Sequence, residues 1–152
     1  MPNLTEQQRS DYLRDEYLML QSQYEDYDTR SLTIKGWVTG GALVASGLTV
    51  AGEHSWMVPI CIAVVVASIW YLEACWKLFQ YALRGRIEEI EAYFRGEGES
   101  LVPMQSYHVW FKSYSVGNRS HRLLVAGFQH FVCLPYLPII VMCAICSWFL
   151  YP

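Results

Sequence analysis

The chain has 152 residues, a length that suits one domain rather than two. Hydrophobic residues make up 53% of it and charged residues 16%, whereas a soluble domain averages about 25% charged. This balance argues against an ordinary water-soluble domain and favours an integral membrane protein, in which Trp and Tyr collect at the two interfaces. The polar start, Met1 to Arg9, has no apolar core and does not resemble a signal peptide.

The cysteines do not describe a secreted disulfide framework, because their number is odd and all lie in or beside apolar runs. Cys143 and Cys146 have a spacing found in metal sites, yet no polar residues nearby support a metal there. We interpret the cysteines as small packing residues and expect no metal or other cofactor. They are Cys61, Cys75, Cys133, Cys143 and Cys146.

The first segment, residues 1–31, is expected to form a cytoplasmic amphipathic helix. Between residues 4 and 30, aromatic and leucine side chains recur at spacings of three and four, which is the period of one helix face. The remaining faces are acidic, whereas a helix lying on a lipid surface carries more Lys and Arg. We therefore expect this helix to pack on other cytoplasmic helices. Its apolar stripe comprises Tyr12, Leu13, Tyr17, Leu20, Tyr24 and Tyr27.

A transmembrane hairpin is expected over residues 32–95. Its first span covers residues 32–52, and Lys35 is the only charge in it. At about 1.5 Å per residue this stretch reaches about 30 Å, one hydrocarbon thickness. Residues 53–56 are expected to form the tight turn of the hairpin.

The second helix of the hairpin is too long for the bilayer alone. It begins near Met57, is apolar through Leu72, and continues without a strong helix breaker to about Phe94. Its second half is therefore expected to project into the cytoplasm.

The rest of the chain is expected to be a linker and a third span. Gly, Pro and Ser residues punctuate the cytoplasmic linker, residues 96–122, in which residues 107–114 are expected to form a short interfacial piece. The third transmembrane helix occupies residues 123–152, with Pro135 and Pro138 as expected kinks, because each proline removes a backbone donor. The expected fold class is thus an all-α membrane bundle with three transmembrane helices and cytoplasmic helical extensions.

The distribution of positive charge sets the orientation. All eleven Lys and Arg residues lie before the first span, after the second, or near the same interface, and the turn and the C-terminus hold none. Positive residues mark the cytoplasmic side, so the N-terminus is expected in the cytoplasm and the C-terminus in the periplasm or outside the cell. These residues are Arg9, Arg14, Arg30, Lys35, Lys77, Arg84, Arg86, Arg95, Lys112, Arg119 and Arg122.

A row of small residues marks the first span. Gly36 and Gly40 form a GxxxG pattern, and Gly47 and Ala51 extend it. Small residues let helix backbones approach closely in lipid. The row is interpreted either as an oligomer contact or pore lining, or as ordinary packing within one subunit.

Three charges lie near the inner ends of the spans. Glu73 and Lys77 are four residues apart on one helix and are expected to pair, and Lys35 enters at the same depth. Charges within a membrane tend to face protein or water, which favours a gate or ion-attracting ring at an inner mouth. The alternative is an interfacial pair whose lysines extend to the headgroups.

A basic set interleaved with aromatic residues lies in the expected cytoplasmic part. Such a set suits a nucleotide or oligonucleotide, through phosphate contacts and base stacking. Contact with anionic lipid headgroups is the alternative. The candidate ligand-binding residues are Arg84, Arg86, Arg95, Lys112, Arg119 and Arg122.

No residue pattern indicates catalysis. The sequence has no phosphate loop, nucleophile elbow or HExxH motif, so an enzyme is not expected. Gln129 and His130 lie inside the third span, where the histidine is interpreted as a haem ligand or, more simply, as a partner in local hydrogen bonds.

The run from Leu18 to Trp37, LMLQSQYEDYDTRSLTIKGW, joins an acidic helix directly to a span. Followed by a tight turn and a long returning helix, this layout over residues 10–95 resembles small bacterial SLATT-like membrane effectors encoded beside nucleotide-signalling enzymes of anti-phage defence. The resemblance implies an oligomer that depolarises or permeabilises the inner membrane on a nucleotide signal. It transfers no site residues.

Two functions follow as hypotheses. The first is a homo-oligomeric channel or pore-forming effector in the bacterial inner membrane, gated by a cytoplasmic ligand and causing depolarisation in anti-phage defence. The second is a non-conducting anchor or assembly subunit that docks a soluble partner enzyme through its acidic, Tyr-rich helix.

Overall fold

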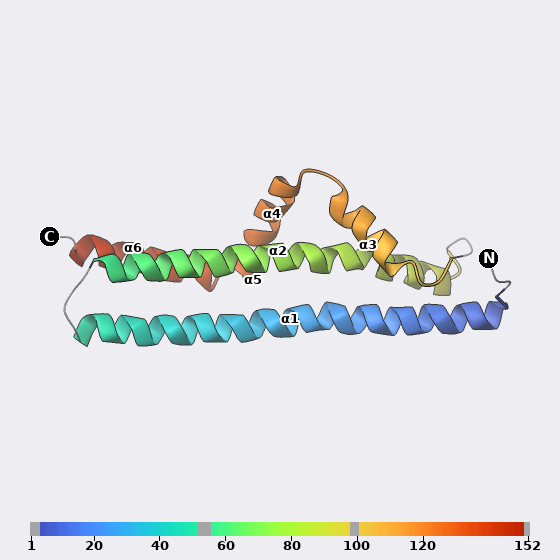
Figure 1. Cartoon of the computed structure of the whole chain (residues 1–152), viewed down its shortest axis with the longest axis horizontal. Helices are drawn as coiled ribbons and strands as arrows, with labels where there is room; N and C mark the ends of the chain where they lie inside the picture. Colours follow the sequence, from blue (N-terminus) through green and yellow to red (C-terminus); the bar gives the residue numbers. More distant parts are fainter. Residues whose placement is uncertain (1–3, 52–55, 98–100, 151–152) are drawn as a thin grey trace. The chain divides into compact units, whose positions relative to one another are not determined.

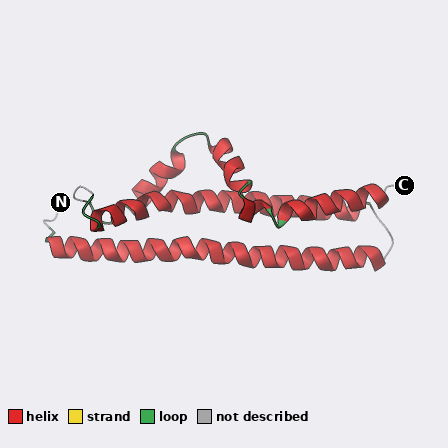
Figure 2. Ribbon diagram, turned by 180° about the vertical axis from the view of Figure 1, so that it is seen from behind, coloured by secondary structure: helices red, strands yellow, loops and turns green. Residues whose placement is uncertain are grey.

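The computed structural model describes residues 4–51, 56–97 and 101–150, and Figure 1 shows them folded as helices joined by short connections. Figure 2 shows no strand in this described part of the chain, which confirms the expected all-α fold class for it. Gly52 and residues 53–55 of the expected turn lie outside the described residues. The helices are α1 (Glu6–Ala51), α2 (Met57–Phe94), α3 (Ser106–Ser115), α4 (Arg119–Gly127), α5 (His130–Cys133) and α6 (Tyr136–Leu150).

The chain divides into two compact units. The first, here called the polar unit, comprises residues 1–28 and 77–119, and the second, the apolar unit, comprises residues 29–76 and 120–152. Both α1 and α2 contribute residues to each unit. Each unit therefore combines segments that are distant in the sequence.

Helix α1 begins with a reciprocal cap. The Gln8 backbone N–H donates to Thr5 Oγ1 (3.3 Å), and the Thr5 N–H donates to Gln8 Oε1 (3.1 Å). This capping box satisfies backbone donors that the start of a helix otherwise leaves free. No proline follows within α1, and the helix continues from its acidic stretch into its apolar stretch as far as Ala51.

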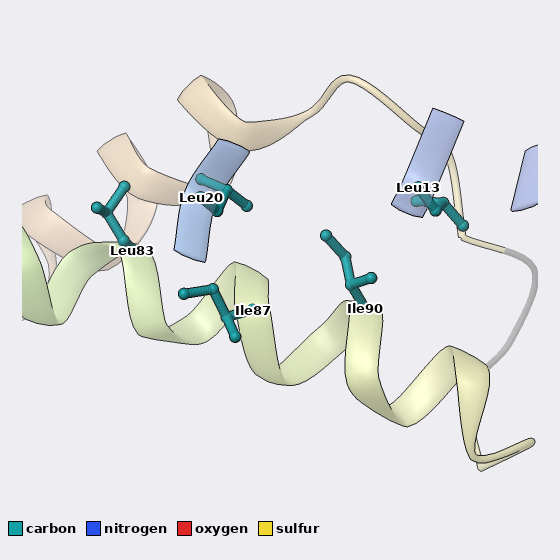
Figure 3. Close-up of a cluster of buried hydrophobic side chains, with 5 residues drawn as sticks. All are labelled: Leu13, Leu20, Leu83, Ile87 and Ile90. Atoms are coloured by element: carbon teal, nitrogen blue, oxygen red, sulfur yellow. The ribbon is translucent and has the colours of Figure 1, made fainter. Parts of the chain in front are cut away.

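A small apolar core between α1 and α2 holds the polar unit together (Figure 3). Leu13 and Leu20 of α1 are 0% and 1% exposed, and they pack with Leu83, Ile87 and Ile90 of α2. Leu13 and Leu20 are two helical turns apart, so both fall on the face that the sequence stripe marks. Half-buried side chains that border this core are Tyr17, Tyr24, Tyr27, Tyr93, Leu101 and Trp110.

Helix α3 packs on α2 inside the polar unit. The indole N–H of Trp110 donates to the Phe79 carbonyl at 3.3 Å. The centre of the Phe79 ring lies 5.3 Å from that of the Tyr114 ring. A Cβ added to Gly85 would lie 3.3 Å from Ser113 Oγ, so the glycine permits this close approach. The stretch expected to be a linker thus contains a helix, α3, whose Trp110 and Tyr114 pack on Phe79 of α2.

The apolar unit contains the candidate membrane span. Within the described residues, α2 is the one helix long and apolar enough to cross a membrane, with a mean hydropathy of 2.0 over a window that is only 22% buried. The sequence predicted three spans, whereas α2 alone among the described helices has the length and hydropathy of a span. In α1, Lys35 and the glycines dilute the apolar stretch, and α6 has only 15 residues.

The third span was expected to be one kinked helix, and this prediction was wrong. Residues 119–150 form three helices, α4, α5 and α6. The first interruption comes at Gln129, whose ψ of 139° is extended. Pro135 precedes α6, and Pro138 lies in its first turn, where a helix needs no backbone donor. The prolines therefore mark the start of α6 instead of kinking its interior.

The core of the polar unit can be tested with two leucines of α1. Leu20→Ala is expected to lower the free energy of unfolding by about 2–5 kcal/mol, because it removes buried methyl groups and leaves a cavity. Leu18→Ala is the matched control, since Leu18 is 54% exposed on the same helix. Denaturation of the full chain in neutral detergent, followed by circular dichroism, measures both. Equal losses in the two variants would contradict the packing described here.

Candidate functional site

No side chain of the described residues packs closely on the glycine row of α1. Gly36, Gly40 and Gly47 are exposed, and a Cβ built on any of them would meet no atom within 4 Å. The side chain of Ala51 lies outside the described residues. For the three glycines, the described residues therefore show an open face and no close contact of the kind that ordinary packing within one subunit would give.

The glycines face away from the side of α1 that α2 covers. An apolar groove of about 410 Å³ lies between the two helices, and Val38, Ala42 and Ala45 belong to its α1 wall. At 3.6 residues per turn, these positions fall on the opposite side of the helix from Gly36, Gly40 and Gly47. The glycine row thus forms a separate, open face.

A buried polar cluster around Glu73, here called the Glu73 cluster, joins four helices of the apolar unit. The Glu73 side chain is 2% exposed, and its carboxylate forms an ion pair with Lys35 Nζ at 2.9 Å. It accepts hydrogen bonds from the hydroxyls of Ser31 and, at 2.6 Å, Tyr136. Lys35 also donates to the carbonyl of Phe131 in α5. The charge of Glu73 is thus both neutralised and fully hydrogen-bonded.

The expected pair between Glu73 and Lys77 does not form, and that prediction was wrong. Lys77 Nζ instead lies 2.6 Å from Asp28 Oδ1 and donates to Gln80 Oε1 at 2.8 Å, both inside the polar unit. Glu73 turns to α1 and α6 because buried donors there satisfy it without exposing its charge. The three charges proposed for an inner mouth therefore belong to two separate networks.

The polar unit has its own buried ion pair, between Glu16 of α1 and Arg86 of α2. Arg86 donates from Nε and Nη2 to the two carboxylate oxygens of Glu16, at 2.9 and 3.0 Å. The backbone N–H of Met104 and the hydroxyl of Ser106 also donate to Glu16, each at 2.8 Å. Arg86 Nη2 donates further to the carbonyl of Val102 at 2.8 Å. One carboxylate thus fastens the segment before α3 to both long helices.

The environment of Glu16 shifts its titration. Burial by itself raises the pKa of this carboxyl, but the hydrogen bonds from Arg86, Ser106 and Met104 outweigh it. The net result is a pKa below the ordinary glutamate value. The folded polar unit therefore prefers Glu16 in its charged form.

The basic residues proposed for a nucleotide have separate surroundings. Arg86 is buried in its ion pair, whereas Lys112 and Arg119 are exposed, and Arg119 lies over the ring of Tyr114. Arg84 pairs with Glu88, and Arg95 pairs with Glu91 and Glu97. Arg122 belongs to the apolar unit. Arg86 is thus removed from any ligand surface, and Arg84, Arg95 and Arg119 each contact a different local partner.

Sequence reasoning missed most members of these networks. Ser31 was detectable, because it precedes Lys35 by four residues and shares its helix face. Tyr136 and Met104 carried no such signal, since their contacts depend on how distant segments pack.

Three comparisons with known proteins give no match: no protein-family model, no curated protein and no solved structure matches the chain. Function is therefore inferred from the side chains themselves.

The Glu16 network predicts a pH dependence of stability. Because the folded pKa of Glu16 is lowered, its contribution is complete above the unfolded pKa, about 4.3, and is lost as the pH falls through the folded value. Glu16→Gln is expected to cost about 3 kcal/mol at neutral pH, because it removes the buried counter-charge of Arg86 and leaves only the half-exposed Glu89 at 3.1 Å. The difference from the wild type should shrink as the medium is acidified.

Unfolding of the full chain in neutral detergent at a series of pH values measures this difference. Glu88→Gln is the matched control, because Glu88 pairs with Arg84 at the surface and should leave the profile nearly unchanged. A pH-independent gap between Glu16→Gln and the wild type would refute the assignment.

Proposed function

We propose that the chain spans a bacterial inner membrane three times and works there as a homo-oligomeric channel or pore-forming effector. The proposed first span is residues 32–52, which include the second part of α1. The second span is the first part of α2. The third is residues 123–152, of which α6 is the main helix. In this proposal the polar unit lies on the cytoplasmic side. The alternative function, a non-conducting anchor for a soluble partner, is considered after the main one.

The observation that carries membrane insertion is the inverted polarity of the apolar unit. Its acid and the hydroxyl that binds this acid are inside, with Glu73 and Ser31 at 2% and 6% exposed. Its large apolar side chains are outside, with Trp37 and Phe149 at 80% and 81% exposed. Water-soluble monomers rarely expose such apolar surface, whereas in lipid apolar residues face outward and charges face the protein interior.

The third span is supported by the way α6 is tied to α2. The Tyr136 hydroxyl at the start of α6 binds Glu73, and Ser147 Oγ near its end donates to the carbonyl of Trp56 at 3.1 Å. The two bonded residues of α6, 136 and 147, are about 16 Å apart at about 1.5 Å per helical residue. Helix α6 thus follows α2 over about half of one hydrocarbon thickness.

The proposed membrane orientation can be tested with fusions at the two ends of the chain. Because all eleven Lys and Arg residues belong to the expected cytoplasmic side, the N-terminus should lie inside and the C-terminus outside. A fluorescent-protein fusion at the N-terminus should fluoresce, and an alkaline phosphatase fusion at the C-terminus should be active. The reciprocal fusions are the controls. Recovery of the chain in the soluble fraction, or both ends on one side, would contradict three spans.

Self-association is supported by the open glycine face of α1. Exposed glycines present backbone to the surroundings, and in lipid a second helix covers such a face better than acyl chains do. Gly36, Gly40 and Gly47 are therefore the proposed contact between copies. The resemblance to SLATT-like effectors adds the consequence, depolarisation in anti-phage defence after a nucleotide signal. For that ligand, Arg84, Arg95, Lys112 and Arg119 remain the accessible candidates.

The anchor function is favoured by one specific observation. Lys35 and Glu73, the charges expected to attract ions at an inner mouth, neutralise each other inside the apolar unit. In that case the exposed part of the polar unit would dock a soluble partner, and no current would flow.

Oligomer formation and conduction are tested together. Gly40→Leu is expected to break the contact, lowering the native mass in detergent and abolishing current across a planar bilayer. Gly41→Leu is the matched control, since a Cβ built on Gly41 also meets no atom within 4 Å, but Gly41 borders the groove toward α2 instead of belonging to the row. A wild-type oligomer without conductance under any nucleotide tested would favour the anchor. A wild-type monomer would reject both the contact and the channel.

A further inference from the structure

An open groove lies on the polar unit, bordered by α1 on one side and by Met104, Ser106 and α3 on the other. Its volume is about 710 Å³. Ligand sites for small organic molecules measure about 300–1,000 Å³. The groove belongs to neither the glycine face nor the Glu73 cluster, and the proposed channel does not use it.

Aromatic rings line much of this groove: Tyr12, Tyr27, Tyr107 and Trp110. Trp110 is held in place, because its indole N–H donates to the Phe79 carbonyl and its ring stacks on Tyr114 at 5.2 Å and 4°. Tyr107 lies 6.1 Å from Trp110 and is 76% exposed. Aromatic rings attract cations through their negative faces, and Trp does so most strongly.

The charge of the groove is negative. Among the described residues that line it, Asp15 and Glu16 are acidic and none is a Lys or Arg. Arg86, which is 2% exposed, neutralises Glu16 from behind through their two hydrogen bonds. The exposed Asp15 therefore supplies the net negative charge that a ligand meets. A phosphate would meet carboxylate and ring faces there, whereas a cation would be favoured by both.

The rim carries two flexible sulfur-containing side chains, Met19 and Met104, which are 47% and 73% exposed. Met104 has a φ of +60°, a conformation that costs a non-glycine residue energy and that Glu16 stabilises by accepting its N–H. Methionine adapts its shape to apolar ligands and contacts aromatic rings favourably. The methionines therefore suit the apolar body of a ligand whose charged end lies at Asp15.

From these observations we infer that the groove binds a small organic cation, a protonated amine with an aromatic or aliphatic body. The ammonium group lies between Asp15 and the rings of Tyr107 and Trp110, and the body contacts the methionines. This ligand class differs from the nucleotide expected at the basic residues. The inference holds for an anchor as well as for a channel.

The test compares three probes that share one ring system and differ in charge: 1-naphthylmethylamine, 1-naphthylmethanol and 1-naphthyl phosphate. Calorimetric titration of the full chain in zwitterionic nanodiscs, with empty nanodiscs as blank, measures each affinity. The amine should bind saturably and at least about tenfold more tightly than the alcohol or the phosphate, because it alone adds cation–π and carboxylate contacts. Equal affinities, or no saturable binding of the amine, overturn the proposal.

Variants locate the binding. Asp15→Asn and Tyr107→Leu change exposed side chains and should each weaken amine binding about three- to tenfold. Asp26→Asn, an exposed acid of the same helix away from the groove, is the matched control and should leave binding unchanged. Three indistinguishable variants would overturn the site. Tighter binding of a Lys-rich helical peptide, lost in the same two variants, would overturn it in favour of a basic protein segment.

Discussion

The ion pair between Lys35 and Glu73 is the interaction on which the apolar unit depends. Without its partners, the Glu73 carboxylate would be an uncompensated charge inside an apolar assembly, which is among the most costly arrangements a protein can contain. Lys35, Ser31 and Tyr136 together remove that cost. Lys35 also donates a hydrogen bond to the carbonyl of Phe131. Because these partners come from α1, α5 and α6, compensating one charge also fixes which segments surround α2.

The interruption between α4 and α5 fits the same requirement. The chain leaves helical geometry at Gln129, and the carbonyl of Gly127 just before it accepts the indole N–H of Trp70 at 2.9 Å. The ring of Phe128 packs edge-on against Trp70 at 5.3 Å. A carbonyl freed by a helix end needs such a donor, above all in lipid. The break thus re-aims the chain so that Tyr136 reaches Glu73 without leaving backbone groups unsatisfied at this point.

The polar unit uses a second buried acid in the same way. Glu16 collects donors from α2, from the segment before α3 and from the start of α3, and its lowered pKa keeps it charged. The apolar core of Leu13, Leu20 and Ile90 gives α1 and α2 a common face, but apolar contact is not directional. The bidentate Arg86 pair supplies the direction, because its geometry admits one register.

Local periodicity was enough to predict the long helices. The stripe through Leu13 and Leu20, the continuous run of α2 and the small-residue row all follow from residue spacing alone. The pairing of charges was not predictable in this way. Glu73 and Lys77 satisfy the spacing rule of an exposed helix, where that pair is worth only about 0.5 kcal/mol, and a buried network easily outweighs it. Pro135 and Pro138 were misjudged for a similar reason, since a proline kinks a helix interior but is neutral at its start.

The neutral Glu73 cluster narrows what a channel built from this chain would look like. With Lys35 and Glu73 satisfied inside one subunit, charge attraction at an inner mouth is not available to draw ions in. Any conducting path would instead lie between copies that meet at the far side of α1, where Gly36, Gly40 and Gly47 leave backbone accessible. A non-conducting anchor needs no such path. Channel and anchor therefore differ in whether copies of α1 leave water between them.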